Sequence, residues 1–143
     1  MQFTRASHYG LRAMIDLALH CDQGPVRVKD ISRREGIPEK YLEKLMHRLK
    51  RKHIVRGVRG PGGGYVLGKS SKEITAKDIL DVVEGPTAPV ICLRHDYSPG
   101  KCARERGCTS RVVWEQVARK VDEVLAGLTL AELVEQARAT EGR

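Results

Sequence analysis

Two short helix-forming segments joined by a tight turn constrain the fold of this chain more than any other feature. Residues 28–35 form the first segment, and apolar residues recur at helical spacing over 41–49 in the second, which ends near residues 51–52. Pro38 stands where helix starts favour proline, and Gly36 occupies the turn between the segments. This arrangement is typical of a helix-turn-helix.

A β-hairpin is predicted directly after the second helix. The β-branched or aromatic runs at residues 54–58 and 65–67 flank the turn Arg-Gly-Pro-Gly-Gly-Gly at 59–64. A helix-turn-helix followed by a hairpin is a winged helix. Helical periodicity also predicts helices at about residues 7–21, 74–83 and 109–126, with a short last helix through Ala137. The expected fold class is therefore mainly α with a small β-hairpin.

We expect the chain to divide into three regions. Residues 1–85 hold the winged helix-turn-helix domain, residues 86–108 form a segment with no steady period, and residues 109–143 hold a long helix and a C-terminal helix. The long helix carries an apolar stripe that needs a partner surface, so we expect it to mediate dimerisation. The stripe consists of Val113, Val117, Val121 and Val124.

The net positive charge comes from the first half of the chain. Residues 1–69 hold 15 Lys and Arg against 6 Asp and Glu, whereas residues 70–143 hold 11 against 12. This imbalance favours a polyanionic partner, double-stranded DNA above all. No apolar run approaches the roughly 18–20 residues that span a bilayer, and the first residues lack the apolar stretch of a signal peptide. We therefore expect a cytoplasmic protein with no membrane partner.

The outer face of the second helix and the tip of the hairpin carry the candidate DNA-binding residues. Arg59 stands at the tip, where the neighbouring glycines let the backbone approach a phosphate or enter a narrow minor groove. Glu43 can accept a hydrogen bond from cytosine N4 in the major groove, or it can pair with a neighbouring lysine. A nucleotide-binding loop does not fit, since neither GxGxxG after a buried strand nor GxxxxGKS is present. The candidates are Lys40, Tyr41, Glu43, Lys44, Arg59, Gly60 and Gly62.

Three of the four cysteines, Cys92, Cys102 and Cys108, fall within residues 86–108. In a chain expected in the cytoplasm, thiols clustered this way favour metal ligation or redox chemistry over structural disulfides. Together with His95 they form a Cys-x-x-His…Cys…Cys set that also suits tetrahedral zinc. Cys21 lies on or beside the apolar face of the first helix, and we expect a buried thiol there.

Four segments carry a resemblance to a known family. They are Tyr-Gly-Leu-Arg-Ala-Met at residues 9–14, Tyr-Leu-Glu at 41–43, Arg-Gly-Pro-Gly-Gly-Gly-Tyr at 59–65 and Leu-Thr-Leu-Ala-Glu-Leu at 128–133. Over almost its whole length the chain resembles the winged-helix repressor family that includes IscR, NsrR and CymR. The resemblance implies a transcriptional repressor that forms a homodimer through its long helices and binds a pseudopalindromic DNA site.

The resemblance also implies a cofactor. Members of this family with three cysteines before the long helix bind an iron–sulfur cluster, which makes Cys92, Cys102 and Cys108 the implied ligands here. A 2Fe–2S cluster is favoured over 4Fe–4S, and the implied signal is cluster status, nitric oxide or redox state. The spacing departs from the family pattern, because nine residues rather than five separate the first two cysteines.

Three thiolates leave such a cluster one protein ligand short. In IscR-like members a histidine three positions after the third cysteine completes the site, but Arg111 stands there in this chain and cannot bind a metal. In NsrR-like members a carboxylate near the N-terminus of the other subunit completes it, and that position matches His8. The resemblance thus points to the partner subunit's His8, and His95 within the segment is the alternative.

Other functions stay open from the sequence alone. A thiol-redox or zinc-responsive regulator would keep the winged helix and hold no cluster. A dimeric adaptor would control an enzyme by contact and would not use its DNA-binding face. An enzyme is the least favoured class, since no nucleophile–base pair and no phosphate loop is present.

Overall fold

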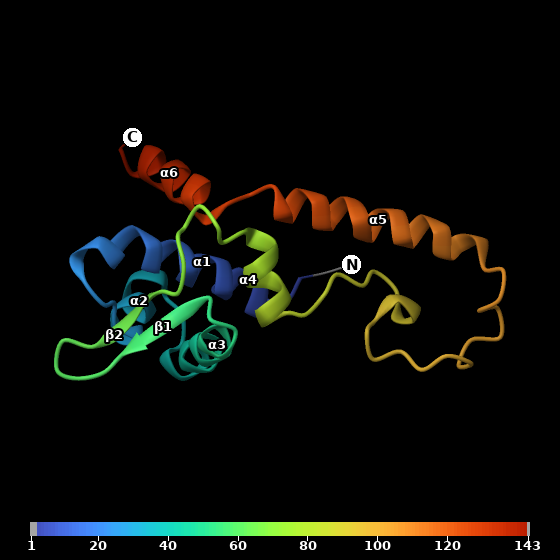
Figure 1. The fold of residues 1–143 in the computed structure, drawn as a ribbon, viewed down its shortest axis with the longest axis horizontal. Helices are drawn as coiled ribbons and strands as arrows, with labels where there is room; N and C mark the ends of the chain where they lie inside the picture. Colours follow the sequence, from blue (N-terminus) through green and yellow to red (C-terminus); the bar gives the residue numbers. More distant parts are fainter. Residues whose placement is uncertain (1–2, 143) are drawn as a thin grey trace.

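The computed structural model describes residues 3–142 and confirms the expected fold class, a mainly α chain with one β-hairpin (Figure 1). Two three-residue 3-10 helices, η1 (Cys21–Gln23) and η2 (Ile91–Leu93), supplement the regular elements. The regular elements are α1 (Arg5–His20), α2 (Val28–Glu35), α3 (Glu39–Arg51), β1 (Val55–Val58), β2 (Gly64–Leu67), α4 (Ala76–Val83), α5 (Thr109–Ala126) and α6 (Leu130–Glu141).

Helices α1 to α4 and the hairpin form a body from which α5 extends (Figure 1). The chain between α4 and α5 lies beyond the body, toward the far end of α5, and α6 returns to pack against α1. Within residues 3–142, no helix combines the length and the apolar character that crossing a bilayer would require.

Polar caps determine where several helices begin. Thr4 caps α1 by accepting a hydrogen bond from the Ala6 amide at 3.2 Å, so α1 begins at residue 5 rather than at residue 7. Thr129 and Glu132 form a capping box at the start of α6, as predicted. This helix runs to Glu141, beyond the predicted end at Ala137. Its last turn is exposed throughout and carries no apolar pattern, so the sequence did not indicate it.

The core is aliphatic and lies between α1, the helix-turn-helix and α6. Each buried side chain lies on the inner face of its element, which accounts for the spacing in the sequence. Truncation of one such leucine to alanine would cost about 2–5 kcal/mol of unfolding free energy. The largest fully buried side chains include Met14, Leu17, Ile31, Leu42, Leu45, Met46, Leu49, Ile74, Ile79 and Leu130.

The hairpin is joined to the chain that precedes α2. Strands β1 and β2 pair antiparallel, with Val55 opposite Leu67. Val26 adds a bridge to this ladder, because its amide donates to the Tyr65 carbonyl at 2.8 Å and its carbonyl accepts from the Tyr65 amide at 2.7 Å. In the hairpin, here called the wing, β2 is therefore paired on both sides, with β1 and with Val26.

Candidate functional site

The exposed face of α3 carries four of the predicted DNA-binding residues. Its buried leucines and methionine turn inward, so the opposite face points to solvent. Tyr41 lies at the margin of that face, 36% exposed, and its ring packs edge-on against Tyr9 of α1 with 5.6 Å between the ring centroids. Glu43 forms no ion pair with another residue of the range 3–142. The exposed set is Lys40, Tyr41, Glu43 and Lys44.

The turn between α2 and α3 sets the angle of α3. Gly36 ends α2 with a φ of 64°, a left-handed conformation that glycine adopts without strain. The Ser32 hydroxyl donates to the Ile37 carbonyl at 2.5 Å across the turn, and the Ile37 side chain is buried. The helix-turn-helix predicted from the sequence is therefore present and tightly closed.

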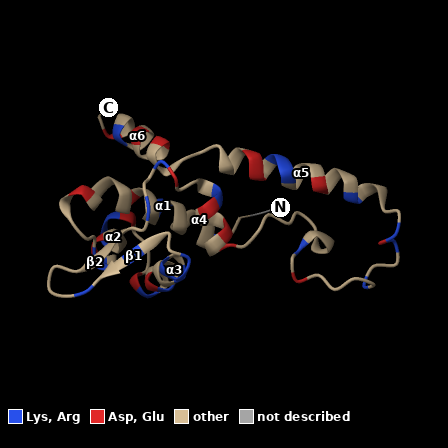
Figure 2. Ribbon diagram, viewed as in Figure 1, with Lys and Arg blue, Asp and Glu red and all other residues tan. Residues whose placement is uncertain are grey.

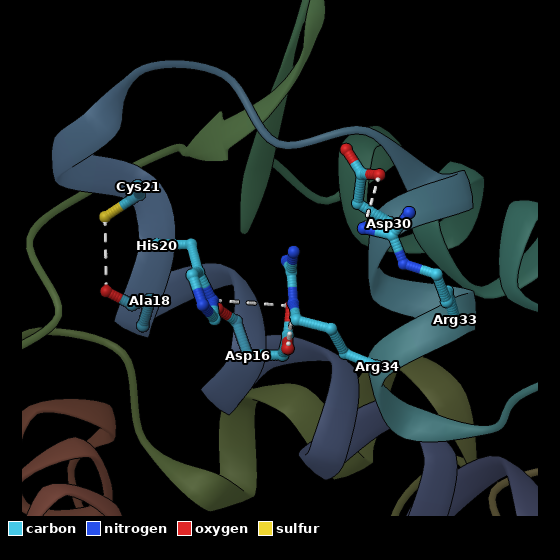
Figure 3. A network of polar contacts seen from close by, with 7 residues as sticks. All are labelled: Asp16, Ala18, His20, Cys21, Asp30, Arg33 and Arg34. Carbon is cyan, nitrogen blue, oxygen red and sulfur yellow. Dashed lines mark hydrogen bonds and ion pairs between the residues drawn. The ribbon is translucent and has the colours of Figure 1, made fainter.

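A buried ion pair fixes α2 on α1 (Figure 3). The Arg34 guanidinium donates two hydrogen bonds to the Asp16 carboxylate, at 2.9 and 2.7 Å, and this pairing raises the pKa of Arg34. Only 2% of Asp16 is exposed, and the His20 ring lies beside it, with Nδ1 3.7 Å from a carboxylate oxygen. On the outer side of the same helices, Arg12 forms an ion pair with Glu35 at 3.1 Å. The position of the helix-turn-helix thus depends on α1.

The wing presents Arg59, Gly60 and Gly62 at its exposed tip. A hydrogen bond attaches the tip to the chain before α2, because the Arg27 side chain there donates to the Pro61 carbonyl at 2.6 Å. Glycine is required at position 64, where β2 begins after the turn, since a Cβ there would lie 2.5 Å from the Val26 carbonyl oxygen. The wing therefore has a fixed position beside α3.

The charges follow the division expected from the sequence. Figure 2 shows Lys and Arg along α3, together with some Asp and Glu, and Lys or Arg at the turn of the hairpin, while both signs alternate along α5. The helix-turn-helix and wing together form a surface on which basic residues outnumber acids, and the exposed acids of α3 are Glu39 and Glu43. Such a surface suits the phosphate backbone of DNA, which carries one negative charge per about 1.7 Å of duplex.

Residues 86–108, here called the cysteine segment, form an open loop. Cys92 and Cys108 are half-buried, Cys102 is exposed, and all three are free thiols. Within residues 3–142, no three His, Cys, Asp or Glu side chains lie close enough together to hold a metal ion. The chain alone therefore assembles neither the three-cysteine set nor the set that includes His95. The segment has one three-residue helix and no buried side chain, so ligand bonds rather than packing would have to draw the thiols together.

The donor chemistry of the segment nevertheless suits an iron–sulfur cluster. The Ser110 hydroxyl and backbone amides at the start of α5 hydrogen-bond the Cys108 sulfur and lower the pKa of its thiol, which favours the ligating thiolate. Burial raises the pKa of Tyr97, and Glu105 and Cys102 raise it further. The Tyr97 hydroxyl is buried and finds no hydrogen-bond partner within residues 3–142. It is thus a free donor beside the thiols, of the kind that stabilises cluster sulfur.

The candidates for a fourth ligand lie apart. His8 is exposed in the first half of α1. His95 is exposed and, with Phe3, Glu84 and Arg94 among the lining residues, borders a hollow of about 300 Å³ where the cysteine segment leaves α4. Arg111 forms an ion pair with Glu115 at 2.8 Å and takes no part in ligation.

The end of α4, at the start of the cysteine segment, contacts two other helices. The Glu84 carboxylate accepts hydrogen bonds from the Thr4 hydroxyl, from the Thr4 amide at 3.2 Å and from the Ser7 hydroxyl at 2.7 Å. The neighbouring Val83 carbonyl accepts from Arg48 of α3 at 3.3 Å. Sequence analysis missed this junction, because its partners are far apart in the chain and no motif marks them.

Helix α5 has no buried residue and exposes an apolar strip. Leu125, near its C-terminal end, packs against the core. Of the predicted dimerisation stripe, Val113 and Val124 are exposed, whereas Val117 and Val121 are half-buried. Dimerisation through this helix stays a prediction, and large apolar side chains of the helix lie in solvent. The exposed ones are Val112, Val113, Trp114 and Val124, at 50%, 55%, 40% and 62%.

Comparison with known proteins is consistent with this geometry. The family model Rrf2, described as an iron-dependent transcriptional regulator, matches residues 3–136. The transcriptional regulator IscR of Erwinia tasmaniensis is 38% identical over 134 residues, which cover 94% of this chain and 79% of that protein. A putative HTH-type transcriptional regulator of Azotobacter vinelandii, ORF2, is 38% identical over 140 residues.

Two solved structures have the same fold at clear sequence identity. CymR, the global cysteine regulator of B. subtilis, superposes with a TM-score of 0.77 at 35% identity and covers 95% of this chain and 98% of its own. T. potens IscR superposes with a TM-score of 0.76 at 36% identity, over 96% and 88% of the two chains. The named relatives are regulators and not enzymes. This chain therefore belongs to the Rrf2 family of winged-helix transcriptional regulators.

Proposed function

We propose that this chain is a cytoplasmic homodimeric repressor that binds a pseudopalindromic DNA site and senses an iron–sulfur cluster, 2Fe–2S in preference to 4Fe–4S. Residues 1–85 would bind DNA, residues 86–108 would hold the cluster and residues 109–143 would pair the two subunits. The observation that carries the proposal is the junction at the end of α4. There the end of α4, directly before the cysteine segment, contacts both α1 and the recognition helix α3.

Each predicted DNA-binding residue has a role in this proposal. Lys40 and Lys44 would contact phosphates, while Tyr41 and Glu43 would face base edges in the major groove. Arg59 would enter the minor groove at the wing tip, where Gly60 and Gly62 leave room for the sugar–phosphate backbone. Because the Tyr41 ring rests on Tyr9, its position depends on that of α1.

The cluster, when bound, would supply a group whose loss or oxidation changes the bonding of the thiolates. Cys92, Cys102 and Cys108 would hold it, with the partner subunit's His8 or His95 as the fourth ligand. Glu84 would hold the start of α1, and Arg48 would hold α3 to the end of α4. A displacement of the cysteine segment would thereby reach both helices that position the DNA-binding face.

Cluster binding is tested by anaerobic purification, followed by iron and sulfide analysis and electron paramagnetic resonance. Cys102→Ala should lose the visible absorbance without unfolding. Cys21→Ala is the matched control, because the Cys21 thiol lies outside the segment and donates to the Ala18 carbonyl at 3.4 Å. A wild-type protein without iron and sulfide would reject the cluster, and retained absorbance in Cys102→Ala would remove that ligand.

DNA binding is tested with cluster-loaded and cluster-free protein on a duplex selected by the wild-type protein from a random-sequence pool. Arg59→Gln should weaken binding in both states, since the wing contact does not depend on the cluster. Equal affinity of the loaded and free wild-type protein for every selected duplex would contradict sensing. Absence of any salt-dependent binding would contradict the regulator itself.

The surroundings of Cys108 favour one alternative, a regulator that responds through its thiols without a cluster. The pKa of this thiol is lowered by Ser110, and thiolates are the reactive form. One solved relative, CymR of Staphylococcus aureus, has a structure of its oxidized form, with a TM-score of 0.72 at 30% identity. In this case the purified protein would contain no iron, and peroxide would change DNA affinity in the wild type but not in Cys108→Ala.

A further inference from the structure

A second hollow lies between the C-terminal turn of α3 and the strand β1, beside the DNA-binding face. Lys50 follows Glu43 by two helical turns and therefore lies on the same exposed face of α3. Arg56 belongs to β1, the strand that leads to the wing tip. The hollow has a volume of about 270 Å³ and is lined by Lys50, His53, Val55, Arg56, Gly57 and Gly68.

The polar lining of this hollow is basic throughout. Lys50, His53 and Arg56 are all exposed, and none of them takes part in an ion pair with another residue of the range 3–142. Two full positive charges and an imidazole N–H donor therefore border one hollow with no carboxylate to neutralise them. Such an arrangement attracts an anion.

Two glycines keep the hollow open. A Cβ on Gly57 would lie 3.4 Å from the Lys50 ammonium nitrogen, so this ammonium group lies over bare backbone of β1. A Cβ on Gly68 would lie 2.1 Å from the His53 carbonyl oxygen, which excludes any larger residue there. Glycine inside a strand often marks a place where another group approaches the backbone closely.

The backbone at His53 fixes where its side chain lies. Its φ is 61°, the one positive φ of a non-glycine residue within residues 3–142. This left-handed residue ends α3, because the His53 amide donates to the Lys50 carbonyl and the Ile54 amide donates to the Leu49 carbonyl, both at 3.0 Å. Glycine is the usual residue at this position of a helix end, whereas this chain has histidine. Here the side chain borders the basic hollow.

We propose that this hollow binds a phosphoryl group, and that its occupant is a backbone phosphate of the bound DNA. The inference rests on the proposed DNA-binding function. With α3 in the major groove and Arg59 in the minor groove, the phosphate ridge between the two grooves passes between helix and wing. The hollow lies at that place, because α3 ends at Arg51 and β1 begins at Val55.

The first arm of the test measures salt dependence with the full-length dimer and the duplex selected by the wild-type protein. Lys50→Gln and Arg56→Gln should each weaken binding severalfold and reduce the slope of log K against log salt by about 0.9, with base preference unchanged. Arg119→Gln is the matched control, because it removes the same charge from the exposed surface of α5.

His53→Gly separates a binding role from a structural one. Because glycine accepts the left-handed conformation, the melting temperature should stay the same or rise while DNA affinity falls. A variant as stable as the wild type with unchanged DNA affinity and unchanged phosphate binding would remove His53 from the site.

The second arm adds inorganic phosphate to DNA-free protein and follows the His53 ring resonances by NMR, assigned with His53→Gln. Reduced salt slopes in the Lys50 and Arg56 variants assign the site to DNA. Shifted resonances with unreduced slopes assign it to a free phosphorylated ligand. Slopes equal to that of Arg119→Gln together with unmoved resonances overturn the proposal. If the wild type binds no DNA at all, the proposed function fails and the phosphate titration alone decides this site.

Discussion

The two partners of the Asp16–Arg34 ion pair should respond unequally to removal, with the larger loss of stability for Arg34→Met. The Asp16 side chain is 3% exposed, whereas that of Arg34 is 30% exposed. Arg34→Met leaves a buried carboxylate without its two hydrogen bonds of 2.9 and 2.7 Å. Asp16→Asn leaves a guanidinium that can turn toward water, and the amide oxygen still accepts one hydrogen bond.

The expected magnitudes follow from this asymmetry. Removing one partner of a buried ion pair costs about 3–5 kcal/mol, and we expect about 3–4 kcal/mol for Arg34→Met. Asp16→Asn should cost about 1–2 kcal/mol, because water screens the partly exposed guanidinium. The double substitution Asp16→Leu with Arg34→Met should cost less than Arg34→Met alone, since no buried charge remains.

Urea unfolding followed by circular dichroism measures these differences, with all variants at the same protein concentration. Arg33→Met is the matched control. It breaks the pair of Arg33 with Asp30, whose side chains are 72% and 37% exposed, and should cost about 0.5 kcal/mol or less. Equal losses for Arg34→Met and Arg33→Met, or a larger loss for Asp16→Asn than for Arg34→Met, would refute this explanation of how α2 is held.

Further predictions concern Glu84 at the end of α4 and Gly64 in the wing. Although partial burial acts in the opposite direction, the hydrogen bonds from Thr4 and Ser7 lower the pKa of Glu84. The resulting stabilisation is present above the unfolded value of 4.5 and is lost as pH falls through the folded pKa. The stability difference between wild type and Glu84→Gln, measured on metal-free protein, should therefore shrink as pH falls below 4.5. Gly64→Ala should cost about 1–3 kcal/mol and weaken DNA binding, because its Cβ would meet the Val26 carbonyl at 2.5 Å.

Each of these predictions has a nearby control. Glu73→Gln removes an exposed carboxylate just before α4 that forms no ion pair with another residue of the range 3–142, and it should leave the pH dependence below 4.5 closer to that of the wild type. If the stability difference between wild type and Glu84→Gln stayed constant with pH, the negative charge of the Glu84 carboxylate would add nothing to the stability that these hydrogen bonds provide. Gly62→Ala places its Cβ in open space and should leave stability unchanged. A Gly64→Ala protein with wild-type stability and DNA affinity would contradict the close packing of the wing on Val26.

Local patterns were sufficient to predict most of the fold. The turn at Gly36, the glycine-rich wing and the capping box of Thr129 with Glu132 all act within a few residues, so the sequence displays them directly. Exposure of Lys40 and Arg59 follows from the same patterns, since helical and hairpin periodicity separates inner from outer faces.

Contacts between distant residues could not be predicted in this way. Asp16 and Arg34 are 18 residues apart, and Thr4 and Glu84 are 80 apart, so no sequence spacing connects them. The positive φ of His53 was likewise not predicted, because no glycine or other motif in the sequence marks the residue at which α3 ends. The cysteine segment has neither period nor buried side chain, and its ligand geometry depends on bonds that the chain does not make by itself.

Helix α5 is long enough that a small rotation about one of its ends displaces the other end by about the length of a bond. Its 18 residues span about 27 Å, with Leu125 packed against the core at one end and Cys108 just beyond the other. A rotation of about 5° about the Leu125 end displaces the Cys108 end by about 2 Å, close to the roughly 2.3 Å length of a metal–sulfur bond. A bonding change at the thiols therefore needs only a few degrees of helix rotation to be accommodated. The same helix would pair the two subunits of the proposed dimer. The rotations of its two copies would then add together in changing the distance between the two DNA-binding faces.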